Sequence, residues 1–197
     1  MLSWLTDQPV VVGLGVVVLM LADWMLTVAQ ERERSLHYSE HYQSYPVDTI
    51  EGNPAFREAV AARRVINPRH LIAAMVVGAV VGLAMEITSA SVHEPLIGYC
   101  WGLFLIVCSQ HLSNLIGYRA ARRGVYGKLW LHLRTGYITQ AGRYFSLTLL
   151  LLVLAAASRS PFIYGVTLAG LTSSIRQLVW IRKVPADDAG DPRPAGA

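Results

Sequence analysis

Charged residues are scarce in this sequence. Asp, Glu, Lys and Arg make up 15% of its 197 residues, whereas soluble domains carry about 25%, and 53% of the residues are hydrophobic. This deficit argues against an ordinary soluble protein and favours a lipid environment. The length suits one domain, with no room for a separate soluble catalytic domain. The first nine residues contain no Lys or Arg, so we expect no cleavable signal peptide.

Cysteine is also rare, since the chain has only Cys100 and Cys108, both in one apolar run. If that run is helical, eight residues separate the two by roughly 12 Å along the axis. A disulfide needs Cα atoms within about 7 Å, so an intrachain bond is excluded. We expect both residues to be small buried hydrophobic side chains.

Several enzyme signatures are missing from the chain. It has no Ser/His nucleophile arrangement, no glycine loop for phosphate, and no Asp-rich motif of the phosphatidyl-alcohol transferases. These absences disfavour the corresponding reaction classes, and we expect a protein that is not an enzyme.

Long apolar runs dominate the sequence instead. The first run, 10–29, contains one charge, Asp23, and its 20 residues match a hydrocarbon core about 30 Å thick. We predict an all-α polytopic membrane bundle over 1–183, followed by a disordered tail at 184–197 that is rich in Pro, Ala, Gly and Asp. The bundle is predicted to have five spans, at about 10–29, 71–91, 96–118, 137–157 and 162–181.

The basic residues give this bundle an orientation, because Lys and Arg accumulate in cytoplasmic loops. Six of them lie in the 30–69 loop and six more in the 119–143 connector. In a five-span arrangement, 16 of the 17 Lys and Arg residues fall on one side, the exception being Arg159. The pattern predicts an outside N-terminus and a cytoplasmic C-terminus.

The same distribution bears on partners. The basic connector at 119–136 has apolar residues at helical spacing, including Trp130, which predicts an interfacial helix on anionic headgroups. An irregular basic loop is the alternative. Because the charges lie beside the membrane, nucleic acid is not the expected partner. The polar 30–69 loop is a candidate contact for a cytoplasmic protein.

Two glycine pairs indicate close helix packing. Gly78 and Gly82 form a GxxxG in the second span, and Gly98 and Gly102 form another in the third, after a turn predicted at 92–95. We expect the two pairs to face each other in an antiparallel hairpin, or to support a homo-oligomer. Glu86 is four residues after Gly82 and should then point into this hairpin.

Ionisable and polar residues within the spans are the candidate site. A charged group there costs about 2.5–3.5 kcal/mol, so it needs a partner or a purpose. Asp23, His111, Asn114 and Arg176 are at matching depth and predict a polar site that opens to the cytoplasm. That site would bind an ion or small polar solute; alternatively, the same residues form a buried pair that only fixes helix packing. Glu86 lies toward the opposite face.

The first loop holds a second candidate site. His37, Glu40 and His41 read H-x-x-E-H, which on a helix would place both histidines on zinc and Glu40 as a general base. Asp48 or Glu51 would supply the further ligand. The alternative is a Tyr/His-rich interfacial strip without metal. Zinc is the one cofactor that the sequence suggests.

Two Asn-Pro pairs read as helix starts. In Asn53-Pro54 and Asn67-Pro68, an N-cap asparagine precedes a proline at the first helical position. They predict a helix over 55–65 and the beginning of the second span. Glu51 precedes the first cap and is expected to bend back toward the bundle.

Asp23 and Thr27 on the first span, followed by Glu51-x-Asn53-Pro54, resemble uncharacterised prokaryotic multi-pass membrane families with a D…T…E-x-N-P pattern. The likeness covers about the first 70 residues and departs from the pattern in the long insertion between Thr27 and Glu51. It implies a helical bundle in a prokaryotic plasma or inner membrane, no assigned reaction, and cooperation between Asp23 and Glu51.

Three functions remain open from the sequence. The first is ion or small-solute transport through the Asp23 site. The second is a non-catalytic scaffold or accessory subunit that binds a partner through the first loop. The third is a zinc-dependent membrane hydrolase that uses the H-x-x-E-H motif.

Overall fold

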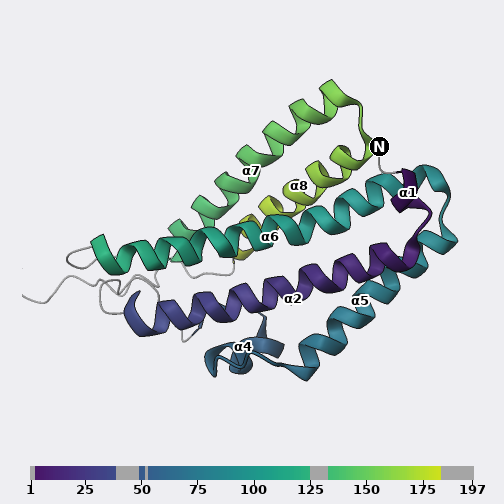
Figure 1. The fold of residues 1–197 in the computed structure, drawn as a ribbon. Coiled ribbons are helices and arrows are strands. Elements are labelled where there is room, and N and C mark those ends of the chain that lie inside the picture. Colours follow the sequence, from purple (N-terminus) through teal and green to yellow (C-terminus); the bar gives the residue numbers. More distant parts are fainter. Residues whose placement is uncertain (1–2, 39–48, 52, 125–132, 183–197) are drawn as a thin grey trace, which may run out of the picture.

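The computed structural model describes residues 3–38, 49–51, 53–124 and 133–182, and the regular secondary structure in these ranges is all helical, without a strand (Figure 1). A wide π-helical turn, η1, continues helix α2. In chain order the elements are α1 (Ser3–Thr6), α2 (Pro9–Glu33), η1 (Arg34–Tyr38), α4 (Pro54–Ala61), α5 (Pro68–Ile87), α6 (Ala90–Gly124), α7 (Leu133–Ser158) and α8 (Pro161–Ile181).

Four helical segments among the described residues are long and apolar enough to cross a membrane: Pro9–Leu36, Pro68–Ile87, Ala90–Ala120 and Arg134–Ser158. They support the predicted class, a multi-pass helical membrane protein. Helix α8 is not among these four, so the count of five spans and the orientation remain predictions.

The long helices pack in a row whose order differs from their order in the chain. Helix α8 lies between α7 and α6, and α2 lies between α6 and α5 (Figure 1). Helices α5 and α6 are consecutive but make little contact with each other. The expected α5–α6 hairpin packing is therefore wrong, because α2 occupies the place beside each of them.

Because α5 and α6 are not packed together, their glycine pairs contact different helices. Gly78 faces Gly13 of α2, and a Cβ at Gly82 would lie 3.2 Å from the carbonyl oxygen of Pro9. Gly98 and Gly102 instead face α8, where a Cβ at Gly102 would lie 3.0 Å from the Cα of Val166. The small residues thus bring backbones together within one chain, and homo-oligomerisation through them stays a prediction.

The buried face of α8 is lined by small and polar residues, which pack against α6 and α7. Ser174 donates from Oγ to the carbonyl oxygen of Ala141 on α7 at 3.0 Å. The buried residues of this face are Gly165, Thr167, Ala169, Gly170, Ser173, Ser174 and Gln177.

Two short turns close one end of the row. The turn between α5 and α6 is at Thr88–Ser89 and not at 92–95, because α6 already begins at Ala90. His93 fastens this turn, with Nδ1 at 3.0 Å from the carbonyl oxygen of Thr6 and Nε2 at 3.2 Å from that of Thr88. The tight turn at 158–161 between α7 and α8 is confirmed, with Arg159 at φ 51°.

The two predicted asparagine caps are confirmed. Asn53 Oδ1 accepts from the backbone N–H of Ala55 at 3.0 Å, and Asn67 Oδ1 accepts from that of Arg69 at 3.1 Å. Helix α4 is shorter than expected and ends at Ala61, after which Arg63 takes a positive φ of 55°.

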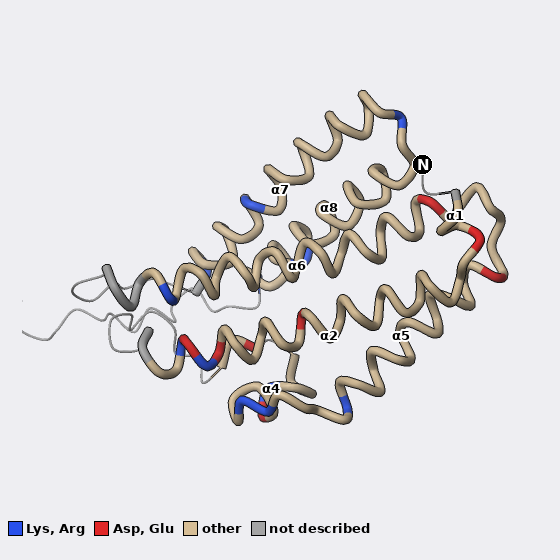
Figure 2. The backbone as a smooth tube through the Cα atoms, in the orientation of Figure 1, with Lys and Arg blue, Asp and Glu red and all other residues tan. Residues whose placement is uncertain are grey.

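Basic residues gather at the end of the row where α2 ends and α5 begins, as Figure 2 shows along the tube. The core of the predicted interfacial connector, 125–132, and the predicted disordered tail, 184–197, lie outside the described residues. Cys100 and Cys108 are free thiols and partly buried, as the helical spacing predicts.

Candidate functional site

Asp23 and His111 meet between α2 and α6. Asp23 Oδ1 lies 3.2 Å from His111 Nε2, and the two side chains are 24% and 23% exposed. Their chain separation is large, so the contact depends on α2 and α6 lying side by side, which they do over much of their length. The structure thus brings together two of the residues that were placed by depth in the sequence.

The pair is poorly satisfied despite its short distance. Asp23 Oδ1 and His111 Nδ1 are buried atoms without a hydrogen-bond partner among the described residues. The 3.2 Å contact therefore has the distance of an ion pair but not the alignment of a hydrogen bond. Buried polar groups are normally hydrogen-bonded, so this pair retains unused capacity to bind a polar group.

His70 of α5 is a third polar group, which contacts α2 close to Asp23 in the chain. Its Nε2 lies 3.1 Å from the carbonyl oxygen of Met20, one turn before Asp23 on α2. Its ring stacks on Trp24 at 4.7 Å between centroids and meets Phe56 edge-on at 5.3 Å. His70 is 6% exposed, and its Nδ1 has no hydrogen-bond partner among the described residues.

Trp24 ties this aromatic cluster to the loop before α5. Its Nε1 donates to the carbonyl oxygen of Val65 at 2.9 Å, and its ring packs with the buried Val28 and Val60. These contacts fix α4 against α2. The rigid cluster explains why His70 is held in one orientation beside α2.

Glu51 brings a second carboxylate to the same region. The pKa of Glu51 is raised above its ordinary value of 4.5, chiefly because the carboxylate is partly buried. The charge of Asp23 also raises this pKa. The hydrogen bond from the Asn53 N–H and the charges of His111 and His70 lower it, but by less. The charges of Asp23, His111 and His70 thus act on Glu51. Cooperation of Glu51 with Asp23, which the D…T…E-x-N-P resemblance implies, stays a prediction.

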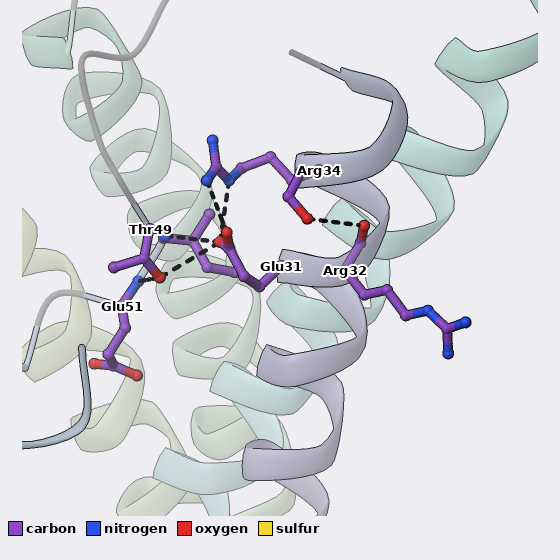
Figure 3. A network of polar contacts seen from close by, with 7 residues as sticks. Glu31, Arg32, Arg34, Thr49 and Glu51 are labelled. Atoms are coloured by element: carbon purple, nitrogen blue, oxygen red, sulfur yellow. Dashed lines mark hydrogen bonds and ion pairs between the residues drawn. The ribbon is translucent and has the colours of Figure 1, made fainter. Parts of the chain in front are cut away.

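A separate cluster around Glu31 fixes the backbone that carries Glu51 (Figure 3). Glu31 is 1% exposed and accepts two bonds from Arg34, at 2.7 Å from Nη2 and 3.0 Å from Nε. It also accepts from the backbone N–H of Ile50 at 3.0 Å and from Thr49 Oγ1 at 3.4 Å.

The hydrogen bonds continue from this cluster to the start of α4. The Glu51 N–H donates to Thr49 Oγ1 at 3.3 Å, and the Asn53 N–H donates to Glu51 Oε1 at 2.6 Å. Figure 3 shows the Glu51 carboxylate pointing away from Glu31. Glu31 thus holds residues 49–51 against the end of α2, and the Glu51 carboxylate takes no part in the Glu31 cluster.

Sequence reasoning missed Glu31, Arg34 and Thr49. The available signal was the run Gln30-Glu31-Arg32-Glu33-Arg34, in which Glu31 and Arg34 are three residues apart and can pair on one helix face. Their role could not be read from that spacing, because the partners Thr49 and Ile50 lie beyond the 39–48 segment.

The other predicted members of the transmembrane site have different partners. Asn114 Oδ1 accepts from Gln110 Nε2 at 2.8 Å, so this amide is engaged within α6. Arg176 forms no ion pair with Asp23; its guanidinium is exposed and lies 5.3 Å from the ring centroid of Trp180. Glu86 does not point into an α5–α6 hairpin, as was expected, but is exposed beside α2 at one end of an apolar groove with Gly82.

The zinc hypothesis gains nothing from the described residues. Glu40, His41 and Asp48 lie outside them, and only the backbone of His37 is described. Within the part of the chain that the structure describes, no three His, Cys, Asp or Glu side chains are placed to hold a metal ion. Asp23, Glu51, His70 and His111 therefore do not form such a group among the described residues.

Comparisons with known protein families, curated proteins and solved structures give no match to this chain. The chemistry of the site therefore has to be inferred from its own residues.

Proposed function

We propose that this is a five-span membrane protein, with its N-terminus outside and its C-terminus in the cytoplasm, that binds and transports an ion or small polar solute. The observation that carries the proposal is the poorly satisfied Asp23–His111 pair between α2 and α6, with the unsatisfied His70 of α5 on the other flank of α2. An ionisable group inside a membrane is costly and is normally retained for a function.

The chemistry of the cluster favours a proton or a cationic or hydrogen-bonding solute. Two carboxylates, Asp23 and Glu51, supply acceptors, and the Nδ1 atoms of His70 and His111 have no hydrogen-bond partner among the described residues. A solute bound beside the Asp23–His111 pair would satisfy the atoms of that pair and change how α2 and α6 contact each other. Such a change is what a binding-driven opening of the bundle would require.

The orientation is supported by the basic residues, 16 of 17 of which fall on one side of a five-span arrangement. It is tested with cysteines introduced at Ser3 and Arg182 in a background without Cys100 and Cys108. A membrane-impermeant thiol reagent applied to intact cells should label position 3 and not position 182. The reverse pattern, or equal labelling, would refute the orientation.

The transport proposal is tested by flux into proteoliposomes, with protons, monovalent cations and small amine or amide solutes offered in turn. The Asp23→Asn variant keeps the size of the side chain and removes its charge. We expect it to lose at least tenfold in the flux that the unchanged protein supports, while it elutes and unfolds like the unchanged protein.

The matched control is Glu86→Gln, which removes a carboxylate that is exposed at the opposite end of the row. Its flux should equal that of the unchanged protein. Equal flux for Asp23→Asn and the unchanged protein would rule out Asp23 as the transport site.

A further inference from the structure

The opposite side of α6 carries a second polar feature, a groove of about 180 Å³ against α7. Its α6 wall contributes Ser109, Gln110 and Ser113, and its α7 wall contributes Arg143 and Tyr144. It is separate from the Asp23 site, which uses the α2 side of α6. No Asp or Glu lines the groove.

Arg143 is the residue that needs an explanation. It is exposed and lies within the Arg134–Ser158 segment that is apolar enough to cross a membrane. It forms no hydrogen bond or ion pair with the described residues, whereas the exposed Arg176 lies over Trp180. An arginine at membrane depth normally pairs with an anion or a carbonyl, so Arg143 is open to an anionic partner.

The groove is amphipathic along its length. Helix α6 runs toward the end of the row where α2 ends, and α7 runs away from it (Figure 1), so Ser109, Ser113 and Arg143 lie nearer that basic end than Ile106 and Leu147 do. The floor includes Ile106 and Tyr144, which belong to the buried contact with Ala169 of α8. A charged end and an apolar end match a lipid headgroup and the beginning of its acyl chain.

We infer that this groove binds the phosphate of an anionic glycerophospholipid. The Arg143 guanidinium would donate to the phosphate oxygens, and the hydroxyls of Ser109 and Ser113 would add donors, since arginine suits phosphate in both charge and geometry. Basic pockets between transmembrane helices on the cytoplasmic side are typical sites for anionic headgroups. The acyl chain would continue past Leu147 along the exposed Leu150 and Leu154 of α7.

The test is native mass spectrometry of the detergent-purified protein with phosphatidylglycerol or phosphatidylcholine added at equal concentration. We expect one phosphatidylglycerol to be retained in preference to phosphatidylcholine. The Arg143→Gln variant should retain about fivefold less, the affinity ratio that corresponds to ~1 kcal/mol for one basic residue and an anionic lipid.

Arg176→Gln is the matched control, because it removes an exposed arginine of the neighbouring helix that lies outside the groove. It should leave retention unchanged. If Arg143→Gln does not fold, Ser109→Leu fills the groove without removing the charge and should also reduce retention.

Unchanged phosphatidylglycerol retention in Arg143→Gln, or in Ser109→Leu, would overturn the inference. Equal losses in Arg143→Gln and Arg176→Gln would do the same, since they indicate diffuse attraction to basic residues. Displacement of the lipid by excess inorganic phosphate would assign the groove to a soluble phosphate and overturn the lipid assignment.

Discussion

Asp23 and Glu31 lie about two turns apart on α2, yet their carboxylates differ in burial and in the number of hydrogen bonds that they accept. Glu31 is 1% exposed and accepts from Arg34, Thr49 and Ile50. Asp23 has a side chain that is 24% exposed and one ionic neighbour, His111, without an aligned hydrogen bond. One carboxylate has all its acceptor positions used by the protein, and the other does not.

The difference distinguishes a carboxylate that stabilises the fold, Glu31, from one that can bind another group, Asp23. A buried carboxylate with several donors is committed to the fold, because each donor would lose its partner if the carboxylate moved or changed its protonation. Asp23 has few bonds to lose when it binds a proton or solute. On the same helix, Glu31 therefore anchors residues 49–51 of the first loop, whereas Asp23 can exchange its binding partner.

Removing the anchor should have the largest effect on stability. Glu31→Ala leaves the Arg34 charge and the Ile50 N–H without their carboxylate, and we expect a loss on the order of 3 kcal/mol. Thermal unfolding in detergent measures it. The matched control is Glu33→Ala, which breaks the pair of Glu33 with Arg119, a side chain that is 61% exposed, and should cost less than about 1 kcal/mol. Equal losses would show that burial of Glu31 adds nothing.

An intermediate effect, dependent on pH, is expected at Glu51. Because burial raises its pKa, the folded protein binds the Glu51 proton more tightly than the unfolded chain does. The contribution of Glu51 to the free energy of unfolding should be constant below its ordinary pKa of 4.5. It should fall as pH rises from there through the raised pKa of the folded state. Glu51→Gln keeps an acceptor for the Asn53 N–H and removes the titration.

The measurement for Glu51 is the unfolding temperature of both proteins in detergent over a pH series that begins below 4.5. The two curves should separate with rising pH, with Glu51→Gln the more stable at neutral pH. Glu58→Gln, an exposed acid on α4, is the control and should follow the unchanged protein. Parallel curves for Glu51→Gln and the unchanged protein would contradict the burial of this carboxylate.

The smallest effect on stability is expected at Asp23. The pair with His111 is partly exposed and lacks an aligned hydrogen bond, so Asp23→Asn should change the unfolding free energy by less than about 1 kcal/mol. Chemical unfolding of the same preparation used for flux provides the value. A loss as large as that of Glu31→Ala would make Asp23 a second structural acid and remove the contrast between the two.

Local signals in the sequence predicted local features well. The caps at Asn53 and Asn67 depend on residues within two positions, and both hydrogen bonds are present. The apolar runs predicted the long helices, because helix length and hydrophobicity are properties of one segment. Asp23 and His111 were placed at matching depth by their positions along the helices, and the structure has them in contact, but depth alone did not identify α2 and α6 as neighbours.

Rotation and neighbour order were not predictable in the same way. Depth puts Arg176 level with Asp23, but the face that Arg176 occupies depends on how α8 packs between α6 and α7. The glycines of α5 and α6 correctly indicated close helix packing, but the predicted partner was wrong. A short turn does not force two consecutive helices into contact along their length. The Glu31 cluster joins residues across the 39–48 segment, beyond the reach of helical spacing.

The interior position of α8 has a consequence for biosynthesis. Helix α8 follows α6 and α7 in the chain, and among the described elements its buried face of small and polar residues is covered by these two helices. We therefore expect α6 and α7 to reach their final packing only after α8 has been synthesised. A variant truncated before Pro161 would leave α6 and α7 without their common neighbour, and we expect it to be degraded faster than the full chain.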